Sequence, residues 1–264
     1  MAKLKIAEVE KGLVFEWPEE AEEAQEIFYD GLDYLDEGKV GKARVLFKKA
    51  LEKFPEHIDI LHHLSITSED EKEARELNEK AVQIGLSFIS KFDKDSLLEW
   101  GWTENRPFLR AYYQKGLIAF EDKKIEESIK IFNQIIFWNP NDNQGAREML
   151  ADIYLNNNLW EEMVLLDKKY SKDYNPEMNF GIALALFKLG RKEEAMEKLK
   201  RAIKNFPKCA KILLETNPKE PKQVMPGYIA VGGDDQAYSF WEIFGCLWQE
   251  KEAGEWLKEV LEEK

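Results

Sequence analysis

The sequence predicts an all-α protein, built as a right-handed superhelical stack of antiparallel helix pairs. Two observations support this fold class. Charged residues make up 34% of the 264 residues and hydrophobic residues 44%, the usage expected of amphipathic helices with one buried and one solvated face. A pattern of large and small side chains also recurs with a period of about 34 residues, the length of one helix pair. A chain of this length and composition can bury a substantial core.

The pattern is clearest in residues 24–55. Its large side chains are spaced to lie on one stripe of each helix, and its small ones allow the two helix backbones to approach closely. The residues that follow the pattern are Ile27, Gly31, Tyr34, Gly38, Ala43, Phe47, Ala50 and Pro55. We therefore expect a helix pair here, ended by the proline.

Three more copies of the pattern follow. The second begins near Leu109, and the fourth ends at Pro207. The third begins near Asn143 and is degenerate, because Glu162 and Lys169 stand where small residues are expected. Four copies exceed the number of about three that a stable stack requires.

An irregular unit, residues 56–106, separates the first two copies. We expect its first helix to be unusually short and its second to begin with a capping box from Ser68 to Glu71. Residues 93–106 then form an insertion before Pro107 opens the next helix at a first-turn position.

Both ends of the chain depart from the period. β-prone residues on either side of Lys11 and Gly12 indicate a short N-terminal hairpin or arm. Near the other end, a loop rich in proline and glycine precedes a capping pair of helices, the first of which carries Trp241 and Trp248. The predicted organisation is an arm or hairpin at 1–23, a helical stack at 24–207 with the insertion at 93–106, and a loop with capping helices at 208–264.

The repeated residues resemble the tetratricopeptide repeat (TPR), and the resemblance covers residues 24–207. A narrower likeness begins at Glu104. The stretches 104–110, 139–145 and 202–214, and the C-terminal part from Pro226 to Leu257, look like prokaryotic repeat proteins related to the suppressor-of-tumorigenicity family. These resemblances imply a helical-repeat architecture and carry no biochemical activity with them.

TPR proteins usually hold a peptide on the concave face of the stack, and the helix positions that line this face are largely aromatic and aliphatic here. The candidate peptide-binding residues are Phe28, Leu32, Arg110, Tyr113, Leu117, Gln144, Arg147 and Tyr154. The set of Lys, Asn and Arg residues with which chaperone-binding members hold a C-terminal carboxylate is missing. Arg110, Gln144 and Arg147 could instead donate to a carboxylate, so we expect an extended peptide or an acidic tail.

Two alternatives remain open for these residues. Arg110 and Arg147 could pair with acidic side chains of the chain itself, as most surface charges do. The insertion or an end segment could also fill the groove, because an apolar patch of this size is seldom left bare on a monomer.

The function expected from these features is a non-enzymatic protein-protein interaction scaffold or adaptor. The alternative is a structural homo-oligomer whose groove is filled by its own chain. The three histidines and two cysteines are scattered and assemble no nucleophile with a base and no metal cluster, so we expect no enzyme, no metal and no cofactor.

The charge of the chain limits its partners. A net charge of -13 disfavours nucleic acid, whose phosphates require concentrated Lys and Arg, and it favours a basic or neutral protein partner. The sequence shows neither an apolar stretch long enough to span a membrane nor the apolar core of a signal peptide. We therefore expect a cytoplasmic protein without a membrane partner.

Overall fold

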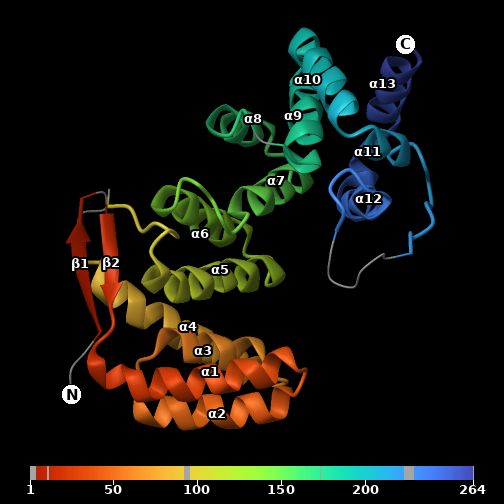
Figure 1. Ribbon diagram of the computed structural model, residues 1–264. Coiled ribbons are helices and arrows are strands. Elements are labelled where there is room, and N and C mark those ends of the chain that lie inside the picture. The colour runs from red at the N-terminus through yellow and green to blue at the C-terminus, as the bar shows by residue number, and fades with distance from the viewer. Residues whose placement is uncertain (1–3, 11, 92–95, 173, 223–228, 264) are drawn as a thin grey trace. The chain divides into compact units, whose positions relative to one another are not determined.

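The repeats fold into antiparallel helix pairs, as the sequence predicts (Figure 1). The computed structural model describes residues 4–10, 12–91, 96–172, 174–222 and 229–263. They form two compact units, Met1–Ala146 and Arg147–Lys264. Of the helices in the described part of the chain, none combines the length and the apolar composition needed to cross a membrane.

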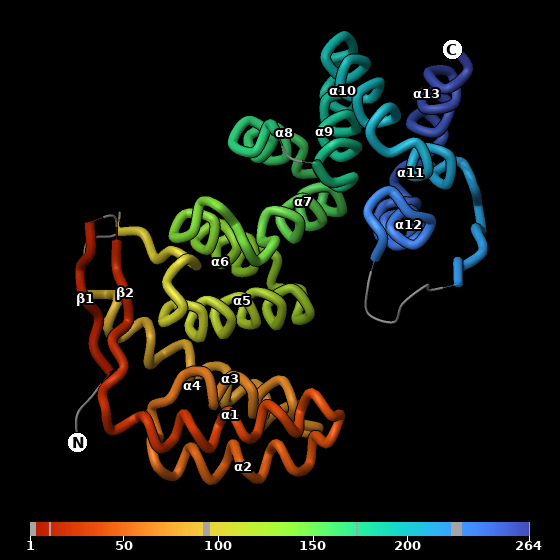
Figure 2. The backbone as a smooth tube through the Cα atoms, in the orientation of Figure 1, coloured from red at the N-terminus to blue at the C-terminus, as the bar shows by residue number. Residues whose placement is uncertain are grey.

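Unit 1 begins with a two-stranded antiparallel sheet and continues as three helix pairs (Figure 2). The strands are β1 (Lys5–Val9) and β2 (Gly12–Glu16), and the pairs are α1 (Glu22–Asp36) with α2 (Val40–Lys53), α3 (Ile58–Ile66) with α4 (Glu71–Ile89), and α5 (Arg106–Glu121) with α6 (Ile125–Trp138). Short 3-10 turns precede α1 and α5, at Glu19–Ala21 and Thr103–Asn105. The predicted hairpin and the short first helix of the irregular unit are both confirmed.

Glycines hold the helices of a pair in close contact. A Cβ atom on Gly31 of α1 would lie 2.5 Å from Cε1 of Phe47 on α2, and one on Gly116 of α5 would lie 2.8 Å from Cζ of Phe132 on α6. Neither distance leaves room for a methyl group. The small and large positions of the repeat therefore meet as its spacing predicts.

The hairpin is part of the core of unit 1. Leu13 and Phe15 of β2 are buried together with Leu98 of the insertion and Phe108 of α5. The side-chain amide of Asn105 fixes this arrangement, because it donates to the carbonyl of Leu13 (2.9 Å) and accepts from the backbone N–H of Phe15 (3.1 Å). The described part of the insertion thus packs against the hairpin, α5 and the end of α6, whereas residues 93–95 of the predicted insertion lie outside the described residues.

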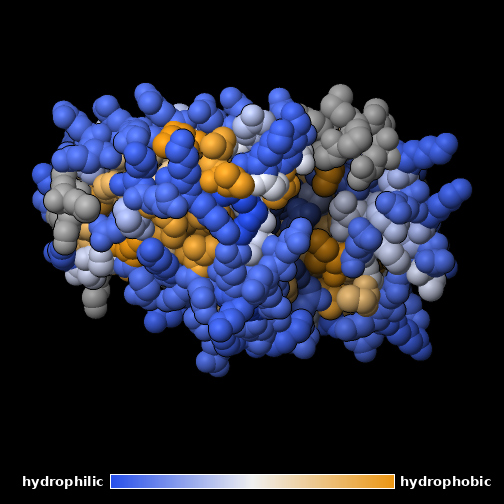
Figure 3. All heavy atoms as spheres, turned by 90° about the horizontal axis from the view of Figure 1, so that it is seen from below, coloured by the Kyte–Doolittle hydropathy of each residue, from blue (hydrophilic) through white to orange (hydrophobic). Residues whose placement is uncertain are grey.

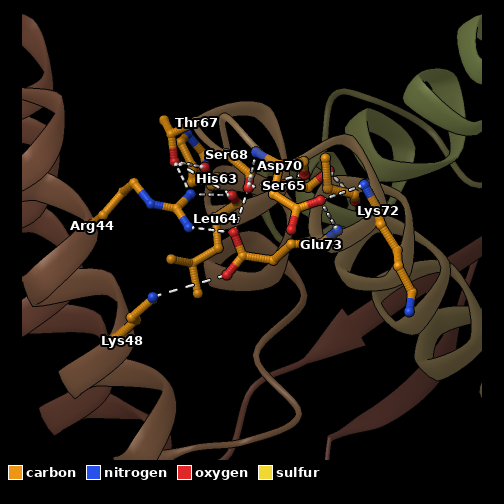
Figure 4. A network of polar contacts seen from close by, with 11 residues as sticks. Arg44, Lys48, His63, Leu64, Ser65, Thr67, Ser68, Asp70, Lys72 and Glu73 are labelled. Carbon is orange, nitrogen blue, oxygen red and sulfur yellow. Dashed lines mark hydrogen bonds and ion pairs between the residues drawn. The ribbon is translucent and has the colours of Figure 1, made fainter.

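The start of α4 differs from the prediction (Figure 4). The N-cap residue is Asp70, whose carboxylate accepts from two backbone N–H groups of the first turn at 2.8 and 3.3 Å. Ser68 lies outside the helix and donates its hydroxyl to the carboxylate of Glu73, which also accepts from Arg44 of α2 at 2.7 Å. The predicted capping box from Ser68 to Glu71 is therefore wrong, because the Asp70 carboxylate reaches both orphan N–H groups by itself.

Unit 2 continues with shorter and less regular helices. They are α7 (Ala146–Asn156), which begins at the last residue of unit 1, α8 (Trp160–Lys169), α9 (Pro176–Lys188), α10 (Lys192–Asn205), α11 (Pro207–Ile212), α12 (Asp234–Trp248) and α13 (Lys251–Glu262). The predicted capping pair corresponds to α12 and α13. Its aromatic rings pack on α9: Phe180 lies 5.4 Å from Phe240 and 5.9 Å from Trp248, and Phe187 stacks on Trp256 at 4.4 Å between centroids.

Candidate functional site

Unit 1 contains a cavity of about 640 Å³, which we call the α1–α3–α5 pocket. It lies where the first half of α1, the polar side of α3 and the start of α5 meet, and the segment after β2 and the turn before α5 complete its wall. The lining residues used below are Trp17, Glu19, Glu22, Gln25, Phe28, Tyr29, Leu32, His57, Asp59, His63, Glu104, Arg106 and Arg110. The pocket thus has aromatic side chains in its wall and both acidic and basic groups around them.

The face of the molecule that carries α1 and α2 is largely hydrophilic, with hydrophobic side chains gathered in patches among the charged ones (Figure 3). The exposed large hydrophobic residues of these two helices include Tyr29 and Val45, which are 57% and 66% exposed. Tyr29 belongs to the pocket wall, whereas Val45 lies on α2 outside it.

A buried ion pair lies in the pocket wall. Nη2 of Arg110 donates to both carboxylate oxygens of Asp59 at 2.8 Å, and Nδ1 of His63 lies 3.3 Å from the nearer of them. The side chain of Asp59 is 11% exposed and that of Arg110 is 34% exposed. Burial raises the pKa of the Asp59 carboxyl, but the hydrogen bond from His63 and the charge of Arg110 outweigh it and hold this pKa well below its usual range. Asp59 is therefore ionised and neutralised by its neighbours at neutral pH.

His57 connects α3 to the aromatic wall. Its Nδ1 accepts from the backbone N–H of Ile60 (3.5 Å) and so caps α3, while its Nε2 lies 2.7 Å from Oε1 of Gln25. Because Nδ1 accepts and the Gln25 oxygen can only accept, the ring carries its proton on Nε2 and is neutral. The ring stacks on Trp17 at 4.5 Å, and burial lowers the pKa of His57 to about 4. The histidine has a structural role here, as a cap and as part of the pocket wall.

The structure brings three of the predicted site residues to the pocket. Phe28, Leu32 and Arg110 line it, and Phe28 is 1% exposed, so its ring is packed into the wall against the neighbouring helices. Tyr113 and Leu117 lie further along α5 and are half-buried, with the Tyr113 ring 5.2 Å from a phenylalanine ring of α6.

The other predicted site residues take part in packing. Gln144 donates its amide to the backbone carbonyl of Leu109 at 3.2 Å. Arg147 and Tyr154 belong to unit 2, where the guanidinium of Arg147 lies 5.3 Å from the centre of the Tyr170 ring and Tyr154 is 5% exposed. Their proposed part in peptide binding stays a prediction.

Sequence reasoning missed Asp59, His57 and Trp17 as site residues. The alternative in which Arg110 pairs with an acidic side chain of the chain is confirmed, and the partner is Asp59. A signal for Asp59 existed, since it lies four residues before His63 and therefore on the same face of a short helix. The predicted site for a partner's carboxylate loses the Nη2 donor of Arg110, because this atom already binds Asp59.

The chain covers part of its own predicted concave surface, but in unit 2. Phe180 and Leu184, at positions equivalent to those of the predicted groove, are fully buried, and the aromatic rings of α12 pack on Phe180. In unit 1 the segment after β2 and the end of the insertion line the pocket and leave its cavity open.

Within the described residues, no group of three or more His, Cys, Asp or Glu side chains could hold a metal ion. Cys209 is buried, and burial raises the pKa of its thiol to about 12, so it carries no nucleophilic thiolate at neutral pH.

One family model matches almost the whole chain. A family model described as transcriptional repressor TCF25 matches residues 15–264, whereas the narrower likeness expected from the sequence begins only at Glu104. No curated protein matches the chain.

Solved structures match at low identity. The crystal structure of MamA is 21% identical, covers 76% of this chain and 99% of its own, and has a TM-score of 0.50. Pseudomonas aeruginosa pilF is 18% identical over 94% of this chain and all of its own, with a TM-score of 0.48. YrrB, described as a TPR protein with an unusual peptide-binding site, is 14% identical over 72% of this chain and 93% of its own, also at 0.48. At 21% identity the match to MamA bears on the fold alone.

Proposed function

The chain belongs to the TCF25 family, and we propose that it is a non-enzymatic scaffold that holds a segment of another polypeptide in the α1–α3–α5 pocket. The observation that carries the proposal is the pocket itself. Its volume of about 640 Å³ lies in the range of about 300–1,000 Å³ usual for ligand sites. Its wall combines an exposed aromatic ring with polar side chains that can pair with a peptide backbone.

The position of the chain's own segments supports an external occupant. Leu13 and Phe15 of the hairpin and Leu98 of the insertion are buried in the core that includes Phe108 and Trp138, and none of the three lines the cavity. The family description, transcriptional repressor, suggests that the bound protein acts in transcription. We propose that such a role works through protein contacts, because a net charge of -13 opposes binding to DNA phosphates.

Partner capture with two matched variants tests the proposal. Tyr29→Ala removes an exposed ring from the pocket wall, and Val45→Ala removes a similarly exposed apolar side chain from α2 outside it. Because aromatic anchors dominate protein interfaces, we expect Tyr29→Ala to weaken binding of the captured partner at least about fivefold and Val45→Ala to leave it unchanged. If both variants bind the partner equally well, the partner does not bind in the pocket, and this part of the proposal is wrong.

Light scattering of the same samples addresses the homo-oligomer predicted as the alternative. A monomer at micromolar concentration excludes it. A stable dimer that Tyr29→Ala dissociates would replace the external partner with a second copy of the chain.

A further inference from the structure

We propose that the segment held in the α1–α3–α5 pocket is basic, and that one of its arginine or lysine side chains lies beside the aromatic wall among Glu19, Glu22 and Glu104. This inference rests on the proposed function and names the chemistry of its partner. It replaces the acidic tail expected from the sequence.

The charges that line the pocket are unequal. Glu19, Glu22 and Glu104 form no ion pair within the described part of the chain, whereas Asp59 is neutralised by Arg110. Arg106 is the remaining lining cation, and it is turned toward Trp100: its Nε donates to the Trp100 carbonyl at 3.0 Å and its guanidinium lies 5.4 Å from the centre of that ring. The pocket therefore offers three carboxylates without an ion-pair partner, whereas Arg110 is paired with Asp59 through Nη2, its buried Nε having no hydrogen-bond partner, and Arg106 faces Trp100.

The aromatic wall suits the same occupant. Tyr29 is 57% exposed, and Trp17 is a second aromatic residue of the lining, with its ring stacked on neutral His57. The negative face of an aromatic ring attracts a guanidinium or ammonium group, and nearby carboxylates add to this attraction. An acidic segment would meet the opposite situation, because Nη2 of Arg110 is occupied and the three free carboxylates would repel it.

The net charge of the chain, -13, adds a long-range component. A field of this sign draws basic segments toward the protein and slows the approach of acidic ones. This long-range attraction acts on the whole surface and does not direct a basic segment to the pocket. The effect of the pocket carboxylates must therefore be separated from that of the net charge of the chain.

The test uses three labelled peptides of equal length that differ at two central positions, which are Arg, Gln or Glu. Their binding to the full chain is measured by fluorescence anisotropy. We expect the Arg peptide to bind at least about tenfold more tightly than the Glu peptide, and its affinity to fall as salt is added.

Two triple variants separate the pocket from the overall charge. Glu19→Gln, Glu22→Gln and Glu104→Gln together remove the free carboxylates of the pocket. The control replaces three exposed glutamates elsewhere in unit 1 and changes the net charge equally: Glu52→Gln, Glu69→Gln and Glu121→Gln. We expect the pocket variant to lose about tenfold in affinity for the Arg peptide and the control to stay within about twofold.

The outcomes distinguish this inference from the proposed function. If the Gln or Glu peptide binds as tightly as the Arg peptide and Tyr29→Ala weakens that binding, the pocket holds peptides but does not select basic ones. An equal loss in both triple variants would assign the effect to overall charge and would also overturn the inference. If none of the three peptides binds, the inference and the proposed function fail together. Circular dichroism confirms that each variant is folded, because Glu22 also lies in the first turn of α1, where a negative charge is favourable.

Discussion

The ion pair between Asp59 and Arg110 predicts an asymmetric response to mutation. Arg110→Met leaves the Asp59 carboxylate, 11% exposed, with the His63 ring, 3.3 Å away, as its remaining polar neighbour. Asp59→Asn leaves Arg110, which is 34% exposed and can regain part of its hydration. Breaking a fully buried pair costs about 3–5 kcal/mol. We therefore expect a loss of about 3 kcal/mol in the free energy of unfolding for Arg110→Met and about 2 kcal/mol for Asp59→Asn, which keeps the shape and part of the hydrogen bonding.

Urea denaturation of the full chain, followed by circular dichroism, measures these losses. The double variant should lose less than the sum of the two single variants by at least about 1 kcal/mol, because each single change leaves the other charge unpaired. Lys53→Met is the matched control. It breaks an exposed pair with Glu23, whose side chain is 64% exposed, and should cost within about 0.5 kcal/mol.

Two results would refute this reasoning. Additive losses would mean that the two side chains do not stabilise each other. A larger loss for Asp59→Asn than for Arg110→Met would mean that the exposed fractions do not decide the cost of an unpaired charge.

Three further predictions concern other parts of the chain. The pKa of His57 is near 6.5 in the unfolded chain and about 4 in the folded protein, so acidification between these values favours the unfolded state. His57→Gln should therefore reduce the loss in the free energy of unfolding between pH 7 and pH 4 by about 3 kcal/mol, measured by urea denaturation at both pH values. A Cβ on Gly85 would lie 2.1 Å from a phenylalanine ring of α5, so Gly85→Ala should lower the free energy of unfolding by about 1–3 kcal/mol. Gly41 has open space around it, and Gly41→Ala should raise the free energy of unfolding by up to about 1 kcal/mol. Equal effects of the two substitutions would contradict the described packing. In the folded protein, a thiol reagent should modify exposed Cys246 much faster than buried Cys209, and mass spectrometry showing equal rates would exclude the described burial.

The repeat period predicted the helix pairs because it reports contacts between residues close in the sequence. Gly31 meets Phe47, and Gly116 meets Phe132, at the small and large positions that the spacing assigns. The same pair therefore occurs in the first and in the second copy of the pattern, which made it recognisable from the sequence.

The site was less predictable because its contacts join segments that lie far apart in the sequence. Arg110 meets Asp59 across 51 residues, and Asn105 binds Leu13 across 92. Helix geometry could place Arg110 on a face of α5, but it could not show that a carboxylate of α3 lies opposite.

The polar wall of the pocket follows from the unusual pattern of α3. Ile58 and Leu61 of this helix belong to the core that includes the hairpin, whereas Ile60 and Leu64 belong to the core between α1 and α2. A helix that is buried on two sides has one side left for its polar residues, and Asp59 and His63 lie there, one turn apart. Because α3 has nine residues, it presents little more than this single polar turn to the cavity. The irregular unit therefore supplies the Asp59 carboxylate that pairs with Arg110 in the pocket wall, whereas the free carboxylates of the lining, Glu19, Glu22 and Glu104, lie outside α3.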